Sequence, residues 1–180
     1  TEQLTELPGI IWIGAAQPEV TLVEVFDFNC PWCHKAAADV ERLLKKNPHL
    51  RVGLLNNPIL SPMSAQAAKV ELAVLKLKGP QTAFAFHQRM FERRGRRDGL
   101  VALDVAEAMK LPRQQIEETA DSDAVRGAMR AQMKLAESLG LSATPSFLLA
   151  GMGILGYPGS KSLAAMVSAT ASCGEVMCKG

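Results

Sequence analysis

The sequence predicts an α/β domain that is interrupted by a helical insertion. Strand-like and helix-like segments alternate at the start of the chain. Strand-like segments are almost absent over 62–140, and the alternation returns after Pro145. In the first part, the apolar segment 20–28 leads into Cys30-Pro31-Trp32-Cys33 and then into a helical pattern. These observations together predict the fold class.

The composition is that of a globular protein. The chain has 180 residues, enough for one domain with a sizeable core or one domain with an insertion. Hydrophobic residues make up 48%, and no apolar run approaches the ~18 residues of a membrane helix. The net charge is +2, and the one basic cluster, 93–97, is short and lacks interleaved aromatic residues. We therefore expect a solvated helix end with its loop there, no nucleic-acid binding and no membrane insertion.

The first part of the chain predicts three strands and one long helix. A short strand lies at 10–13 between two glycines, and a longer one at 20–28. The helix at 30–46 has an apolar stripe at helical spacing and ends at Asn47-Pro48. The third strand lies within 50–60, which prolines close.

The insertion predicts five helices. They cover 64–78, 81–94, 100–110, 112–119 and a last segment that is capped by Asp121 or Asp123 and ends at Gly140. Two helices have clear apolar faces, formed by Phe84, Phe86, Met90 and Phe91 and by Val125, Met129, Met133, Leu135 and Leu139. A methionine-rich face of this kind fills a core more often than it binds a cofactor.

The α/β pattern then resumes. One strand follows Pro145, another lies at 153–157, and a last helix covers 160–172. We expect a discontinuous α/β domain formed by 1–61 and 141–180. The inserted all-helical domain is expected at 62–140.

The two cysteines at 30 and 33 fall where a strand ends and a helix begins. The first turn of a helix has N–H groups without intrahelical partners, and the helix dipole adds positive charge there. Pro31 suits the first helical position, so Cys30 lies at the cap, where a thiolate is stabilised and its pKa falls. Cys33 lies one turn further in and should be less exposed. We predict that Cys30 is the attacking sulfur and Cys33 the resolving partner.

Two other interpretations of this pair remain open from the residues alone. The first is that Cys30 and Cys33 form half of a zinc site. Such a site needs a second pair of ligands, and the only other cysteines, Cys173 and Cys178, are loosely spaced for a zinc-binding pair. His34 points at a different helical angle from Cys33, so we expect it to be exposed. A purely structural disulfide would constrain little of the unfolded chain, because its loop is short.

Cys173 and Cys178 predict a structural disulfide near the last helix. An even number of cysteines in two close pairs suits an oxidising compartment, where this pair would be bridged. The alternative is a copper(I) site, which would use both sulfurs and Met177 as soft ligands. We favour the disulfide and expect no metal site.

The order of these features resembles the thioredoxin fold and, more closely, the DsbA-like thiol:disulfide oxidoreductases of bacterial cell envelopes. The resemblance rests on Phe-Asp-Phe-Asn-Cys-Pro-Trp-Cys at 26–33, the insertion, and Ala-Thr-Pro-Ser-Phe at 143–147, and it covers about 9–172. It implies a thioredoxin-like fold with an inserted all-helical domain. It also implies catalysis by Cys30 and Cys33 without a metal or organic cofactor.

The resemblance assigns further roles around the dithiol. It implies a cis bond between Thr144 and Pro145, and a client peptide that binds in extended form against these residues, Pro31 and Trp32. The residues alone favour a proline at the start of a strand. Strongly oxidising members commonly have His where Trp32 stands and Val where Thr144 stands, so these two positions weaken the expectation of extreme oxidising power.

Glu24 interrupts an otherwise apolar strand six residues before Cys30. The resemblance implies a buried carboxylate beneath the dithiol that transfers protons to and from Cys33, and burial would raise its pKa to suit that role. The alternative is an outward-facing residue at a sheet edge. We expect Asp27 to lie near the surface.

The sequence therefore predicts a thiol:disulfide oxidoreductase that acts on exported proteins and introduces disulfides. The expected partners are cysteine-containing clients and a membrane redox partner, either a quinone-linked oxidase or a transmembrane reductase. The first alternative is a disulfide isomerase or reductase of the suppressor-of-copper-sensitivity type, and the second is a copper-binding module that uses the C-terminal cysteines. We expect a periplasmic or cell-envelope location, and we interpret a chain that opens at Thr1 as a processed or trimmed form.

Overall fold

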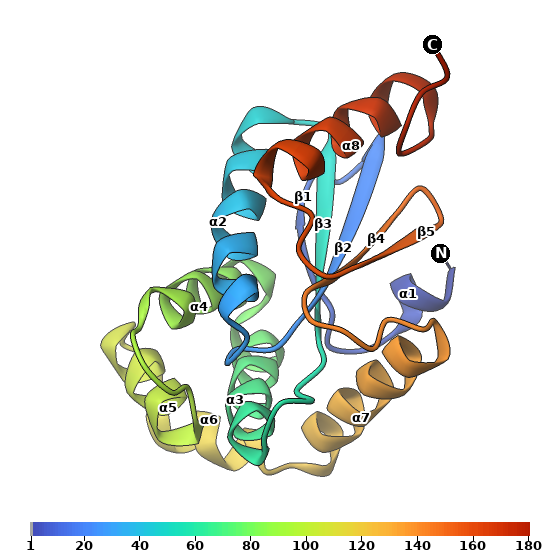
Figure 1. Ribbon diagram of the computed structural model, residues 1–180. Coiled ribbons are helices and arrows are strands. Elements are labelled where there is room, and N and C mark those ends of the chain that lie inside the picture. The colour runs from blue at the N-terminus through green and yellow to red at the C-terminus, as the bar shows by residue number, and fades with distance from the viewer. Residues whose placement is uncertain (1) are drawn as a thin grey trace.

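A five-stranded sheet forms the centre of the protein in the computed structural model, which describes residues 2–180 (Figure 1). The strands lie in the order β1-β3-β2-β4-β5. Their bounds are β1 Ile11–Gly14, β2 Val20–Phe26, β3 Leu50–Asn56, β4 Ser146–Leu149 and β5 Met152–Leu155. The central strand β2 pairs in parallel with β3 and antiparallel with β4, and the two edge strands pair antiparallel with their neighbours.

Eight helices are formed within residues 2–180. Their bounds are α1 Glu2–Glu6, α2 Pro31–Lys46, α3 Pro62–Lys78, α4 Pro80–Glu92, α5 Gly99–Ala108, α6 Arg113–Ala120, α7 Asp123–Ser138 and α8 Ser160–Cys173. Helix α2 connects the parallel strands β2 and β3, and α3 to α7 all lie between β3 and β4. The fold is therefore thioredoxin-like, with helices inserted after β3; the division into two domains stays a prediction. None of these helices combines the length and the apolar character needed to cross a membrane.

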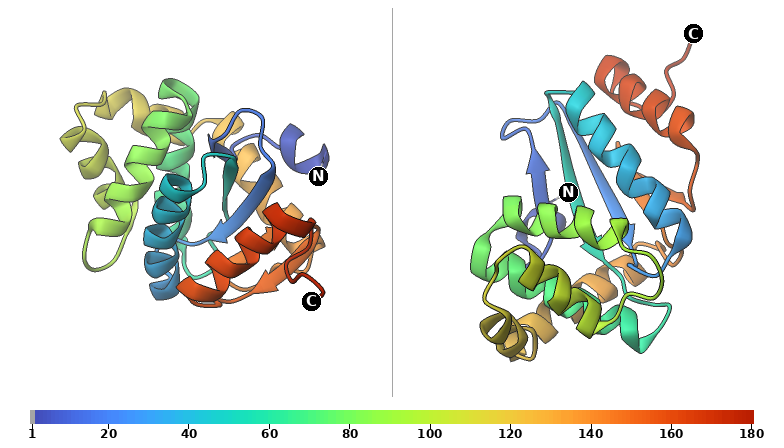
Figure 2. Two further views of the ribbon diagram at one scale, coloured as in Figure 1. Left: turned by 90° about the horizontal axis from the view of Figure 1, so that it is seen from above. Right: turned by 90° about the vertical axis from the view of Figure 1, so that its left-hand side faces the viewer.

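The sheet separates two layers of helices, which Figure 2 shows from two further sides. Because successive residues of a strand face opposite sides, Leu22 and Phe26 pack into the larger core with α2, α4 and α8. Val23 and Val25 pack on the other side, with residues of α1 and α7. Glu24 shares the face of Leu22 and Phe26, so its carboxylate lies on the α2 side.

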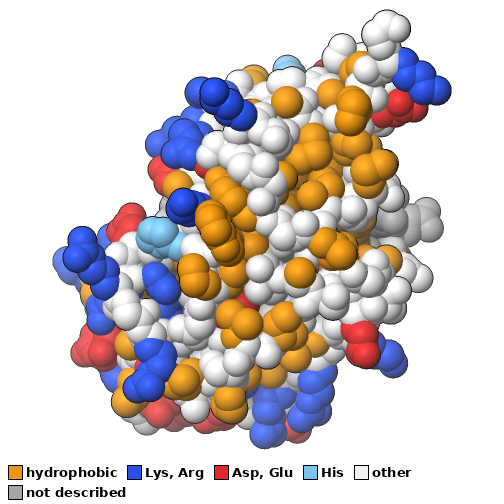
Figure 3. All heavy atoms as spheres, viewed as in Figure 1, with side chains coloured by type: hydrophobic (Ala, Val, Ile, Leu, Met, Phe, Trp, Pro, Cys, Tyr) orange, Lys and Arg blue, Asp and Glu red, His pale blue; other side chains and the backbone are white. Residues whose placement is uncertain are grey.

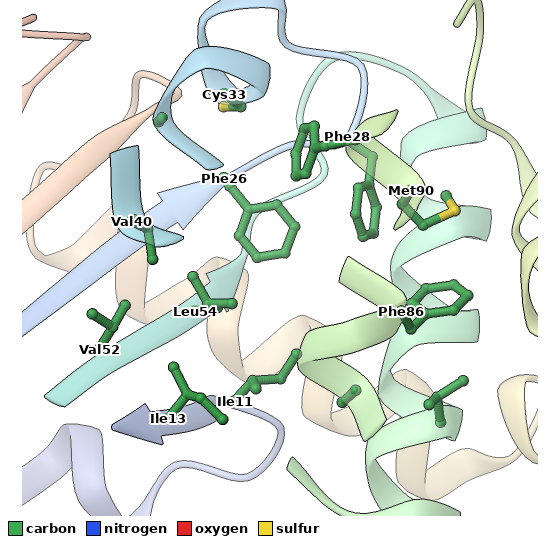
Figure 4. Packing of buried hydrophobic residues seen from close by; sticks show 14 of the residues in the cluster. Ile11, Ile13, Phe26, Phe28, Cys33, Val40, Val52, Leu54, Phe86 and Met90 are labelled. Carbon is green, nitrogen blue, oxygen red and sulfur yellow. The ribbon is translucent and has the colours of Figure 1, made fainter. Parts of the chain in front are cut away.

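Aromatic residues join the dithiol segment to the inserted helices. Figure 4 shows Phe26 and Phe28 between the sheet and α4, with Phe86 and Met90 beyond them. The ring centroids of Phe26 and Phe28 are 5.2 Å apart, and those of Phe28 and Phe86 are 6.5 Å apart, both in edge-on geometry. These four side chains are fully or almost fully buried, so the insertion contributes to the core on which α2 rests.

A chain of four buried polar side chains fixes the helices α3, α4 and α7 against β3. The Asn56 side chain donates to Glu71 Oε1 at 3.2 Å, and Glu71 Oε2 lies 3.1 Å from His87 Nδ1. The backbone N–H of Asn56 donates to Oε1 of Gln132 at 2.9 Å. Since an unsatisfied buried polar group costs about 1–3 kcal/mol, each bond favours this one arrangement of the helices.

Two local expectations are wrong, and one short helix was not expected. Ser122 caps α7 instead of Asp121 or Asp123: its hydroxyl accepts a hydrogen bond from the N–H of Val125 at 3.3 Å. Leu139, expected in the core, is 43% exposed because it lies at the C-cap, where the helix ends. Helix α1 was not expected, because its five residues are too few to show helical periodicity.

Two glycine substitutions test this packing. A Cβ at Gly53 would lie 2.6 Å from Cζ3 of Trp12, the residue opposite it on β1, whereas a Cβ at Gly127 in α7 would meet no atom within 4 Å. We expect Gly53→Ala to lower the free energy of unfolding by about 1–3 kcal/mol through overpacking. Gly127→Ala should raise it by about 0.5–1 kcal/mol, because alanine loses less backbone freedom on folding. Urea denaturation measures both, and a Gly53→Ala protein as stable as the parent would contradict the position of the Trp12 ring.

Candidate active site

Cys30 caps the N-terminus of α2. Its backbone is extended, with φ −83° and ψ 120°, and Pro31 occupies the first helical position. The N–H of Cys33 donates to Cys30 Sγ at 3.3 Å, and the N–H of Cys30 donates to the Asp27 carbonyl at 3.1 Å. The Cys30 sulfur thus faces the amides that the first helical turn leaves unpaired.

The two thiols differ strongly in acidity. Both are free and buried, Cys30 at 4% and Cys33 at 0% exposure. Hydrogen bonding from Cys33, and further from Thr144, lowers the pKa of Cys30 to about 6, although burial acts against it. Burial raises the pKa of Cys33 well above its ordinary value. The pair is therefore set up as one thiolate and one thiol.

The peptide bond between Thr144 and Pro145 is cis and lies beside the dithiol. The Cys30 thiol donates to the Thr144 carbonyl oxygen at 3.3 Å. The Pro145 carbonyl accepts from the N–H of Gly156 at 2.9 Å, which ties this segment to the chain that follows β5. Pro145 is buried and Thr144 is partly exposed, so the backbone next to Cys30 is reachable at Thr144.

Glu24 has a fully buried side chain on β2. Neither carboxylate oxygen has a hydrogen-bond partner among the described residues. Burial raises the pKa of Glu24 well above its ordinary value, and the charges of Cys30, Asp39 and Glu71 act in the same direction. The charge of Glu24 in turn raises the pKa of Cys33, so the two groups interact electrostatically. The raised pKa favours the neutral carboxyl, which carries a proton.

Asp27 was expected near the surface, and this expectation is wrong, since it is 1% exposed. Its carboxylate accepts three hydrogen bonds, from Ser64 Oγ at 2.7 Å, from the N–H of Asn29 at 2.8 Å and from the N–H of Leu60 at 2.9 Å. These donors replace the water that a surface carboxylate would bind. Asp27 thereby ties the loop before the dithiol to the start of α3.

An aromatic pair, the exposed Trp32 and the half-buried Tyr157, lies next to Cys30. Trp32 is 53% exposed and stacks on Tyr157, with ring centroids 5.6 Å apart and planes 19° apart, and Lys35 Nζ lies 4.8 Å from the Trp32 ring centroid. The Tyr157 hydroxyl donates to the buried carboxylate of Asp39, which also accepts from Ser160 Oγ at 2.7 Å. Neither Tyr157 nor Asp39 was predicted to be a site residue. The available signal was that Tyr157 is the one tyrosine of the chain.

Arg97 holds the loop after α4 against the dithiol segment. Its Nε donates to the Met90 carbonyl at 2.6 Å, and its terminal nitrogens donate to the carbonyls of Phe91 and Phe28, each at 3.2 Å. Asn29 and the Arg97 backbone exchange two further bonds of 2.8 Å. The expectation of a merely solvated basic loop is therefore wrong for Arg97, because it satisfies carbonyls at the end of α4.

A disulfide joins Cys173, the last residue of α8, to Cys178, with their Cα atoms 6.0 Å apart. Bridged sulfurs are not thiolates, so in this state Met177 has no thiolate neighbours with which to bind copper(I). Within residues 2–180, no three or more His, Cys, Asp and Glu side chains are arranged to hold a metal ion. His34 is exposed.

Comparison with known proteins places this arrangement in a family. A family model described as thioredoxin matches residues 6–169. A search of curated protein sequences gives no match. Among solved structures, a thioredoxin-like oxidoreductase from Silicibacter pomeroyi DSS-3 is 29% identical, with a TM-score of 0.82 over 90% of this chain and 92% of that one.

Two further structures share the fold at lower identity. The catalytic domain of Proteus mirabilis ScsC is 22% identical, with a TM-score of 0.85 over 95% of this chain and 94% of that one. The thiol-disulfide exchange protein α-DsbA2 from Wolbachia pipientis is 21% identical, with a TM-score of 0.83 over 93% of this chain and 89% of that one. The chain thus belongs to the thioredoxin family and is a thioredoxin-like thiol–disulfide oxidoreductase, and its close Cys30–Cys33 pair fits a redox motif.

Proposed function

We propose that this protein is a disulfide-introducing oxidase of the DsbA type, which acts through Cys30 and Cys33 on cysteines of exported proteins. The observation that supports this most strongly is the stabilised thiolate of Cys30, whose pKa is lowered to about 6. A stabilised thiolate favours the reduced enzyme over the oxidised one. Its disulfide is therefore readily given to a client.

The oxidised enzyme reacts by two thiol–disulfide exchanges. A client thiolate attacks Cys30 Sγ, the bond between the two enzyme sulfurs breaks, and Cys33 leaves with the electron pair and takes up a proton. A second client thiolate then attacks the client sulfur of the mixed disulfide, and Cys30 leaves as a thiolate. The client loses two electrons and the enzyme gains them.

Glu24 supplies the proton that Cys33 needs in the first exchange. Its neutral form is favoured by burial, and it interacts electrostatically with Cys33. Because neither oxygen has a hydrogen-bond partner within residues 2–180, the proton is not held by a competing acceptor of the protein. When the dithiol is oxidised again, the same carboxylate takes the proton back.

The client binds in extended form beside the cis bond at Thr144 and Pro145. The partly exposed Thr144 lies next to Cys30 Sγ, so its backbone is available to pair with a client strand. Pro31 and Trp32, which directly follow Cys30 in the chain, provide exposed apolar surface. The reaction uses no metal or organic cofactor, and a quinone-linked membrane oxidase in the cell envelope restores the disulfide.

A disulfide isomerase or reductase of the suppressor-of-copper-sensitivity type is the second candidate. Trp32 offers the thiolate no positive charge of its own, and Lys35 points its ammonium group toward the Trp32 ring. The pKa of Cys30 is accordingly lowered only to about 6. In this alternative a transmembrane reductase keeps the dithiol reduced. A copper-binding module is disfavoured by the bridge between Cys173 and Cys178.

Titration of the reduced enzyme tests the thiolate. We expect the ultraviolet absorbance of the thiolate to rise with a midpoint near pH 6 and to vanish in Cys30→Ser. Because the folded pKa lies below the ordinary value of 9.0, the thiolate stabilises the reduced fold fully above about pH 9, and this gain is lost as the pH falls to about 6. A midpoint near 9 would remove the basis of the proposal.

Equilibrium with glutathione separates the oxidase from the reductase. We expect a reduction potential between about −270 and −120 mV, the values of a reducing thioredoxin and of a strongly oxidising DsbA, and nearer the latter. A value at the thioredoxin end would favour the reductase. Parallel assays of reduced-client oxidation and scrambled-client rescue give the same distinction by activity.

Substitution of the four cysteines separates catalysis from structure. We expect Cys30→Ser to abolish turnover in every thiol assay, because the remaining sulfur of the pair, Cys33, is fully buried and burial raises its pKa, so it cannot replace Cys30 as the attacking thiolate. The double variant Cys173→Ser with Cys178→Ser should keep most of the activity, since this bridge lies at the end of α8 and not at the dithiol. Turnover that persists in Cys30→Ser would overturn the assignment.

The variant Glu24→Gln tests the proton donor while keeping the side-chain shape. We expect mixed-disulfide formation to slow by about a hundredfold, with a flattened pH profile. We also expect greater stability at neutral pH, because the raised pKa of Glu24 makes its charged form costly as the pH rises above 4.5. Stopped-flow kinetics and urea denaturation measure the two effects, and the exposed Glu19→Gln is the control. An unchanged rate would exclude this role.

A further inference from the structure

A basic cavity of about 860 Å³ opens beside the dithiol. One wall comes from the segment around the start of α2, namely Asn29, Pro31 and His34. The other walls come from the segment before and at the start of α3, Leu60, Ser61 and Met63, and from residues 92–97 after α4. The mechanism above uses only Pro31 of these residues.

The cavity carries an excess of positive charge. Arg93, Arg94, Arg96 and Arg97 line it, opposed by the one acidic lining residue, Glu92. The first three are exposed, and within residues 2–180 their guanidinium groups form neither an ion pair nor a side-chain hydrogen bond. Figure 3 shows Lys and Arg side chains gathered at the edge of the molecule where the inserted helices lie, next to the hydrophobic surface over α2. These cations are free to bind an external anion.

The arginine-containing segment 93–97 is held at a fixed place relative to the dithiol. Asn29 immediately precedes Cys30 and exchanges two 2.8 Å hydrogen bonds with the backbone of Arg97. The Arg97 guanidinium also donates to the Phe28 carbonyl at 3.2 Å. A binding site that is already ordered loses little conformational freedom when it binds, so more of the contact energy appears as affinity.

We propose that this cavity binds acidic side chains of the client polypeptide near its reactive cysteine. The inference rests on the proposed function, since the client sulfur must reach Cys30. A client chain that is held at Thr144 passes over Cys30 and Pro31, and the cavity begins at Pro31. Client carboxylates there meet guanidinium groups, which bind them with two parallel hydrogen bonds. The 52% exposed Leu60 gives apolar side chains of the same segment a contact.

Peptides with two cysteines test this preference. Three peptides of one sequence carry Glu, Gln or Lys at the positions that flank the first cysteine, and stopped-flow measures their oxidation by the oxidised enzyme at low ionic strength. We expect the Glu peptide to react about three- to tenfold faster than the Gln peptide, and the Lys peptide to react more slowly than both. The ratio should approach one at about 1 M salt, where screening acts over ~3 Å.

In the triple variant Arg93→Gln, Arg94→Gln, Arg96→Gln, the ratio of the Glu-peptide rate to the Gln-peptide rate should fall to about one. The matched control is Lys76→Gln, Lys78→Gln, Lys110→Gln, which removes the same charge from exposed positions outside the cavity lining and should keep the ratio. Because each variant is compared with itself on two peptides, partial unfolding leaves the ratio unchanged.

Three results would overturn this inference without overturning the proposed function. A parent enzyme without preference for the Glu peptide shows that the cavity does not select acidic clients, although the oxidase function then stands. A ratio that falls equally in both triple variants shows an effect of net charge alone. A ratio that persists in the arginine variant, while both rates fall, shows that the arginines act on the reacting sulfurs. Failure to oxidise any of the peptides would overturn the proposed function together with this inference.

Discussion

The N–H of Cys33 that points at the Cys30 sulfur is the interaction on which the rest of the site depends. It exists because the chain leaves β2 after Phe26 and begins α2 at Pro31, so the cap falls on a cysteine. The Thr144 carbonyl completes the surroundings of this sulfur from a segment more than a hundred residues away. The sheet brings them together because β4, which follows Pro145, pairs with β2.

A buried acidic residue near the dithiol lowers the stability of the fold. Glu24, Asp39 and Glu71 are three buried acids, and the charges of the latter two raise the pKa of Glu24. Asp39 is satisfied by hydroxyl groups and Glu71 by Asn56 and His87, whereas Glu24 has no hydrogen-bond partner among the residues described. An acid left unsatisfied in a packed core costs stability, and local conflicts of this kind are expected at functional sites.

Most of the fold could be predicted from local signals in the sequence. The apolar strand before the dithiol and the proline between the cysteines each predict their own backbone, and the lack of strand signal over 62–140 predicts the insertion. The cis bond before Pro145 was implied only by the family resemblance, because the residues alone favoured a proline that starts a strand. The errors at Asp27 and Arg97 have a common physical cause. Their surroundings are set by partners such as Ser64 and Phe28, far away along the chain, and no periodicity encodes such contacts. The stacking of Tyr157 on Trp32 escaped prediction for the same reason.

The paired bonds between Asn29 and Arg97 have a consequence for how the site opens. They fasten the residue before the dithiol to the segment that follows α4, so widening the site on this side would break both bonds and the bond from Arg97 to the Phe28 carbonyl. At about 0.5–1.5 kcal/mol for each bond, the loop favours one arrangement before anything binds. Under the proposed function, a flexible client segment that adapts to this arrangement would bind at a lower cost than a rigid one.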